Sequence, residues 1–177
     1  TFHARRQSSE EAARRDLVSE VCRWPDGDEE PQELFVRLSG LIAQTAPVDG
    51  LVLVAADPEG PPELLAQVGD AAACNAALEA VHGAIEQAAP PHPSVILLPL
   101  ARGSETMGWL ALATNGAVPL SNADRAFFGF FSTVLAQALA SRLREVQLRA
   151  AEQRYQQLFQ AAPAMYVIVG LESSVPL

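Results

Sequence analysis

Cysteine and histidine are the side chains in this sequence most able to hold a metal or to act as nucleophile or base. They are few: Cys22, Cys74, His3, His82 and His92. The cysteines lack the short spacing of metal ligands, and no histidine stands at a spacing typical of a serine–histidine–acid site. A G-x-S-x-G motif and a glycine-rich phosphate loop are also missing. We therefore expect no catalytic and no metal-binding residue in this fragment, and two reduced cysteines in a cytoplasmic protein.

Charge narrows the classes of partner. The 21 acidic residues outnumber the 12 basic ones, and the net charge is −9. The densest basic sites, Arg5-Arg6 and Arg14-Arg15, fit solvated helix faces, so we expect neither nucleic acid nor an anionic membrane as partner. No apolar run approaches the roughly 20 residues of a membrane span. The acidic run at 26–30 lacks the ligand spacing of an EF-hand, and we expect a solvated loop there.

The elements that position these residues follow from periodicity and from turn and cap residues. Helical spacing and a Ser8–Glu11 capping box predict a first helix that starts at Ser8. Further helices are predicted over 31–45, over about 71–88 with Asp70 as its cap, and over about 121–161, and strands over 50–57, 63–68, 94–101 and 106–114. The predicted fold class is α+β: an antiparallel sheet flanked by helices, with a long C-terminal helix.

The last two strands should form a hairpin, because Arg102-Gly103-Ser104-Glu105 is a turn between two apolar runs. Side chains alternate along a strand. Alternation puts Trp109, Ala111 and Ala113 on one face of the sheet, and Gly108, Leu110 and Leu112 on the other. Both faces are largely apolar, so we expect both to be covered, one by helices and one by loops or a ligand.

Residues 30–145 resemble a GAF domain. The residues that carry the resemblance are Leu98-Pro99-Leu100, Gly108, Leu110, Leu112, Ser121, Asp124, Phe128, Ala136 and Ala140. The resemblance implies a sensory module with a small-molecule pocket between the sheet and a flanking helix. The residues expected to bound that pocket are Val54, Leu65, Cys74, His82, Leu98 and Trp109.

The ligand itself stays unidentified, because the residues that GAF cofactors need are missing. Cys74 is followed by Asn75, whereas bilin-binding members have a histidine there. Cyclic-nucleotide members carry a lysine-containing signature, and this chain has no lysine. His82 is the only interior candidate for a haem ligand, and a lone helical histidine fits a structural residue better. The enzymatic methionine-sulfoxide reductase type needs a cysteine cluster that Cys22 and Cys74 do not reproduce.

The end of the chain resembles the entry to a PAS domain. The residues concerned are Arg154, Tyr155, Leu158, Phe159, Ala162 and Pro163. Pro163 should end the long helix, and residues 165–169 should form the first strand. We therefore expect four parts: an N-terminal helix and linker over 1–28, a GAF-like domain over 29–140, a signalling helix over 141–161, and a truncated PAS-like start over 162–177.

The signalling helix carries apolar residues at helical spacing with no partner in so short a chain. They are Leu139, Leu143, Val146, Tyr155 and Leu158, and they predict a parallel homodimer. The resemblances imply a regulatory module of a bacterial signal-transduction protein, with a sensor histidine kinase as the expected parent. In that reading the state of a small-molecule ligand or a partner is relayed through the helix to an output domain. The alternative is a ligand-free dimerisation or spacer module in a cyclic-di-GMP enzyme or a phosphatase.

Overall fold

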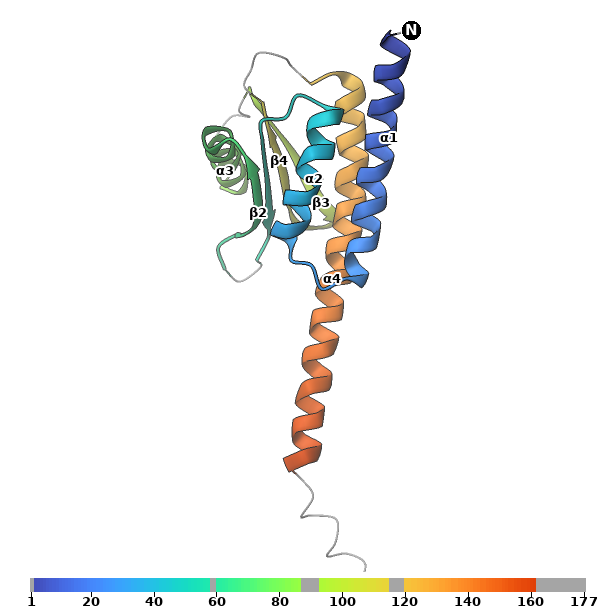
Figure 1. Cartoon of the computed structure of the whole chain (residues 1–177). Helices are drawn as coiled ribbons and strands as arrows, with labels where there is room; N and C mark the ends of the chain where they lie inside the picture. The colour runs from blue at the N-terminus through green and yellow to red at the C-terminus, as the bar shows by residue number, and fades with distance from the viewer. Residues whose placement is uncertain (1, 58–59, 87–92, 115–119, 162–177) are drawn as a thin grey trace, which may run out of the picture. The chain divides into compact units, whose positions relative to one another are not determined.

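The computed structural model describes residues 2–57, 60–86, 93–114 and 120–161 (Figure 1). In chain order the elements are α1 (Phe2–Arg23), a short 3-10 helix (Trp24–Asp26), α2 (Pro31–Thr45), β1 (Gly50–Ala55), β2 (Glu63–Gly69), α3 (Ala71–Ile85), β3 (Val95–Arg102), β4 (Glu105–Ala113) and α4 (Asn122–Ala161). The predicted α+β class, with an antiparallel sheet and a long C-terminal helix, is confirmed. The strand expected at 165–169 lies outside the described residues.

The chain divides into two compact units, Thr1–Ala140 and Ser141–Leu177. The first unit contains α1, α2, α3, the whole sheet and the beginning of α4. The second contains the rest of α4, up to Ala161. A single helix therefore belongs to both units.

The sheet has four strands in the order β2-β1-β4-β3, and each neighbouring pair is antiparallel. The β3–β4 hairpin pairs Leu98 with Leu110 and Arg102 with Glu105. Gly103 takes a positive φ of 64° in the turn, a conformation that glycine adopts without a steric cost. The predicted hairpin is confirmed, and the turn residue that signalled it is the one in the left-handed conformation.

The first helix starts earlier than its capping-box spacing predicts. α1 begins at Phe2, so Ser8 lies inside the helix, and the predicted start at Ser8 is wrong. The residues between Phe2 and Ser8 include no glycine and no proline, so nothing in them stops the helix. At the other end of α1, Arg37 of α2 forms ion pairs with Glu20 and Glu29. The acidic run after α1 is thus partly neutralised by α2.

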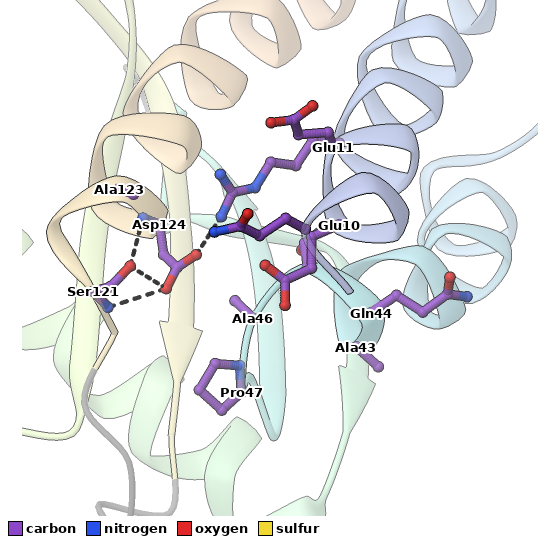
Figure 2. A pocket seen from close by; sticks show the side chains of 12 residues that line it. Glu10, Glu11, Ala43, Gln44, Ala46, Pro47, Ser121, Ala123 and Asp124 are labelled. Carbon is purple, nitrogen blue, oxygen red and sulfur yellow. Dashed lines mark hydrogen bonds and ion pairs between the residues drawn. The ribbon is translucent and has the colours of Figure 1, made fainter. Parts of the chain in front are cut away.

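The start of α4 is capped by a reciprocal pair of side chains. Ser121 Oγ accepts a hydrogen bond from the Asp124 amide at 3.1 Å, and Asp124 Oδ2 accepts one from the Ser121 amide at 3.0 Å (Figure 2). These bonds satisfy amide groups that a helix N-terminus otherwise leaves without partners. Ser121 therefore caps the helix that was predicted over about 121–161.

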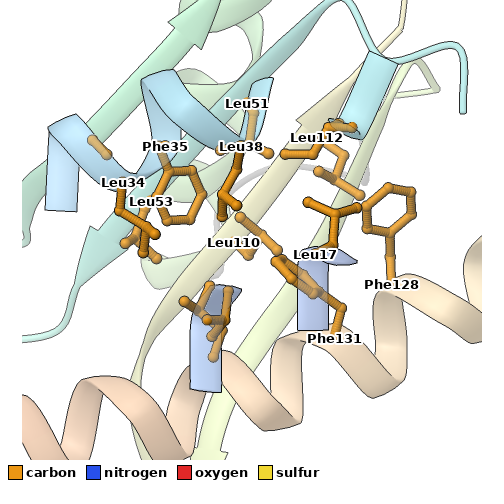
Figure 3. Close-up of a cluster of buried hydrophobic side chains, with 14 of the residues drawn as sticks. Leu17, Leu34, Phe35, Leu38, Leu51, Leu53, Leu110, Leu112, Phe128 and Phe131 are labelled. Atoms are coloured by element: carbon orange, nitrogen blue, oxygen red, sulfur yellow. The ribbon is translucent and has the colours of Figure 1, made fainter. Parts of the chain in front are cut away.

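Each face of the sheet carries its own apolar core. The bundle-side core lies against α1, α2 and the first half of α4, and Leu53, Leu110 and Leu112 are fully buried in it (Figure 3). The α3-side core lies on the opposite face and contains Val52, Ala111 and Ala113. The alternation predicted for β4 is confirmed. Helices cover both faces, because α3 packs on the face for which the sequence predicts loops or a ligand.

α4 is long and apolar enough, by length and composition alone, to pass as a membrane span. Its first half nevertheless packs on its own domain. Phe128, Phe131, Leu135 and Leu139 are buried in the bundle-side core. The apolar composition of this half is accounted for by packing against the sheet and α1.

Candidate functional site

The structure separates the six residues expected to bound one pocket. Val54, Cys74 and Trp109 belong to the α3-side core. Leu65 and Leu98 pack against the bundle-side core, on the opposite face of the sheet. His82 is exposed on α3. The six therefore do not surround a common space.

Two local features explain the separation. The pairing of β1 with β2 shifts between Leu53 and Val54, so that Leu65 has no partner in the ladder and turns toward the bundle side. Such a bulge cannot be read from alternation, because it adds one residue to one strand. Leu98 pairs directly with Leu110 and therefore shares its face.

Beneath α3 the described residues form a packed apolar layer. Val52 and Ala77 are fully buried, and Val81 and Ala111 are equally enclosed. Cys74 contributes the polar atom of this layer, and its thiol donates to the Val68 carbonyl at 3.5 Å. Burial raises the pKa of the Cys74 thiol, so it stays protonated at neutral pH. The layer can exclude water, but its described side chains offer a ligand little besides apolar contact.

A larger hollow lies elsewhere, between α1, the end of α2 and the start of α4 (Figure 2). Its volume is about 640 Å³, within the range of small-molecule sites. Its lining is mostly polar: Gln7, Glu10, Glu11, Arg14, Ala43, Gln44, Thr45, Ala46, Pro47, Ser121, Ala123 and Asp124. No local sequence pattern predicts this cavity, because it brings together residues from three helices that are distant in sequence.

Arg14 is the central cation of that cavity. Its Nη2 lies 2.5 Å from Asp124 Oδ1, across 110 residues of sequence, and its guanidinium lies 5.2 Å from the centre of the Phe127 ring. The Arg14 and Asp124 side chains are 23% and 13% exposed. The expectation that Arg14-Arg15 is a solvated pair is therefore wrong for Arg14. A contact at this separation is a product of tertiary packing and leaves no local signal.

A smaller crevice of about 360 Å³ lies between α2 and the β1–β2 edge of the sheet. Phe35, Ile42, Leu51 and Val68 supply most of its apolar lining. Gly40 opens onto it, and a Cβ at that position would meet no atom within 4 Å. Sequence periodicity offered no sign of this crevice.

The second unit presents apolar side chains to solvent. In α4, beyond Ala140, the exposed large apolar residues are Leu143, Val146, Leu148, Tyr155, Leu158 and Phe159, with exposed fractions of 48–77%. Leu139, which was expected to belong to the same dimer stripe, is only 2% exposed and packs in the bundle-side core. Beyond Ala140, the exposed apolar surface of α4 therefore begins at Leu143.

Within the described ranges, no three His, Cys, Asp or Glu side chains are grouped so that they could hold a metal ion. Arg154, Tyr155, Leu158 and Phe159 of the PAS-like motif lie in α4, whereas Ala162 and Pro163 fall outside the described residues.

Comparison with known proteins identifies the fold. No protein-family model and no curated protein matches the chain. Among solved structures, the GAF domain of a predicted sensor histidine kinase from Pseudomonas syringae pv. tomato superposes with a TM-score of 0.53 and 22% identity, covering 81% of this chain and 99% of that one. The GAF domain of an Acinetobacter phosphoenolpyruvate-protein phosphotransferase gives a TM-score of 0.47 and 13% identity, with 71% and 91% covered. On the first of these likenesses, the chain has a GAF-type fold.

Proposed function

We propose that this chain is a regulatory module of a signal-transduction protein. In this proposal, a change in the GAF-type domain is relayed through α4 to an output domain that follows it. A histidine kinase is our first candidate for that output. The proposal draws on fold-level analogy for the class of protein, and on α4 for the mechanism.

One observation carries the proposal: α4 is built into the domain core at one end and offers an apolar surface at the other. Phe131 and Leu135 are fully buried in the bundle-side core. Leu143 and Val146, two to three turns further on, are 48% and 54% exposed. In this proposal, the continuous helix relays a displacement of the domain to whatever binds its other end.

A second copy of the chain is the partner that fits this surface best. Isolated helices are marginal in water, and the segment after Ala140 has no core of its own among the described residues. Leu143, Val146 and Ala150 follow the 3-4 spacing of a coiled-coil seam. The same helix around a two-fold axis therefore buries the seam in a parallel homodimer.

The apolar residues of this segment form two seams rather than one. The second consists of Leu148, Ala151, Tyr155 and Leu158. Leu148 follows Val146 by two residues, which places it about 200° further around the helix axis. A straight two-stranded coil buries only one seam at a time. We infer that the relay is a population shift between packings that favour one seam or the other.

A second candidate function has an observation of its own. The fully buried Val52, Ala77 and Ala111 leave the described space beneath α3 filled. A ligand-free module that dimerises and spaces its neighbours needs no pocket there. This alternative shares the homodimer with the first proposal and differs in lacking a ligand-controlled shift.

The shared claim is tested by the oligomeric state of a double variant. Leu143→Ser with Val146→Ser should convert a dimer into a monomer by light scattering, while circular dichroism retains the signal of the intact domain. The matched control is Arg144→Ser with Gln147→Ser, which changes exposed polar residues of the same turns and should stay dimeric. A wild-type chain that is monomeric at high micromolar concentration would remove the dimer and the relay together.

A further inference from the structure

We propose that Arg14 is a two-position latch on α4. Paired with Asp124, it ties α1 to the first turn of α4; paired with Glu10 on its own helix, it releases that turn. The inference rests on the proposed function, in which α4 carries the signal. Arg14 acts on α4 through Asp124, so it is a positioning residue of the relay.

In the closed position, in which Arg14 pairs with Asp124, the Asp124 carboxylate makes contacts with both α1 and the cap of α4. Asp124 Oδ1 receives the Arg14 Nη2 contact at 2.5 Å from α1. Asp124 Oδ2 accepts hydrogen bonds from the Ser121 amide at 3.0 Å and the Ser121 hydroxyl at 2.6 Å. The ion pair is largely shielded from solvent, so salt and water weaken it less than a surface pair. Arg14 thereby holds in place Asp124, the partner of Ser121 in the cap of α4.

Close packing does not replace the pair at this end of the domain. The cavity of about 640 Å³ separates α1, the end of α2 and the start of α4 just beside it. The ion pair, with the guanidinium placed against Phe127, links α1 to α4 beside that hollow. A change in the partner of Arg14 can therefore loosen α4 from α1 without opening the bundle-side core.

Glu10 provides the second position. It lines the same cavity, on the wall opposite Asp124, four residues before Arg14 (Figure 2). A glutamate four residues before an arginine is a favourable helix pair. In the closed position Arg14 Nε is buried without a hydrogen-bond partner among the described residues. A buried donor without an acceptor costs free energy. This cost lowers the preference for the closed position, in which Arg14 pairs with Asp124, and favours exchange with Glu10.

Amide hydrogen exchange of the 177-residue chain tests the latch. The reporters are the amides of Asp124 and Arg125, which donate to Ser121 Oγ and to the Ser121 carbonyl. Arg14→Gln should speed exchange at both by about fivefold or more. Arg14→Lys should restore part of the protection because it keeps the charge. Glu10→Gln should slow exchange, because it removes the competing partner.

Three results would overturn the proposal. Exchange at Asp124 and Arg125 could stay within about twofold of wild type in Arg14→Gln. It could rise equally at the core amides of Leu112 and Leu135, which would mean general destabilisation. Glu10→Gln could speed exchange as Arg14→Gln does, which would exclude Glu10 as the competing partner. Light scattering records the oligomeric state separately, so a wild-type chain that is monomeric at high micromolar concentration would refute the dimeric relay and leave the latch standing.

Discussion

Replacing Ala77 with leucine tests whether the space beneath α3 is filled. Ala77 is fully buried, in one cluster with Val52 and Ala111, which are also fully buried. A larger side chain in a filled core forces its neighbours apart, at a cost of about 1–3 kcal/mol. For a loss of about 2 kcal/mol and a urea dependence of about 2 kcal/mol per molar, the unfolding midpoint falls by about 1 M.

Urea unfolding followed by circular dichroism measures this midpoint, and the slope of the transition shows whether unfolding stays two-state. The matched control is Ala72→Leu, the same change at an exposed position in the first turn of α3. It should shift the midpoint little. An Ala77→Leu variant as stable as wild type, or more stable, would refute the packed interior. It would show a cavity under α3 and favour a liganded sensor over a spacer.

Two further predictions concern thiol chemistry and glycine. A thiol reagent at neutral pH should label the exposed Cys22 and spare Cys74 until the chain is unfolded, and equal labelling rates in the folded chain would contradict this prediction. Because burial raises the pKa of the Cys74 thiol, the free energy of unfolding should fall as pH rises above the usual thiol range. Gly69→Ala should lower the thermal midpoint, because φ is 119° there and the new Cβ would lie 2.1 Å from the Asp49 carbonyl oxygen. Gly40→Ala should raise the midpoint, with a gain in unfolding free energy of up to about 1 kcal/mol, because that helical glycine has open space. A fall in both midpoints would count against the reasoning.

Turn residues, cap residues and strand alternation predicted the parts of the fold that depend on neighbouring residues in the sequence. The β3–β4 turn follows from Gly103, and the start of α3 follows from Asp70, whose carboxylate accepts hydrogen bonds from the Ala72 and Ala73 amides. The two faces of β4 follow from strict alternation. Each of these features is decided by residues within a few positions of one another.

Features that depend on packing between distant elements could not be predicted from the sequence. The bulge at Leu65 arises where β1 and β2 pair, and it moves that side chain to the other face. The Arg14–Asp124 contact joins residues 110 positions apart. Leu139 follows the helical spacing of the exposed stripe, yet the domain buries it. Periodicity shows which residues share a helix face and does not show where the domain stops covering that face.

Disulfide cross-linking along α4 tests most directly whether the chain forms a parallel homodimer through that helix. In a Cys22→Ser background, single cysteines at Leu143 and Val146 should form cross-linked dimers under mild oxidation, because a two-fold axis brings equivalent seam residues together. Cysteines at Glu145 and Arg149, which belong to neither seam, should cross-link far more slowly. Equal rates at all four positions, or no cross-linking at Leu143 and Val146, would contradict the dimeric relay.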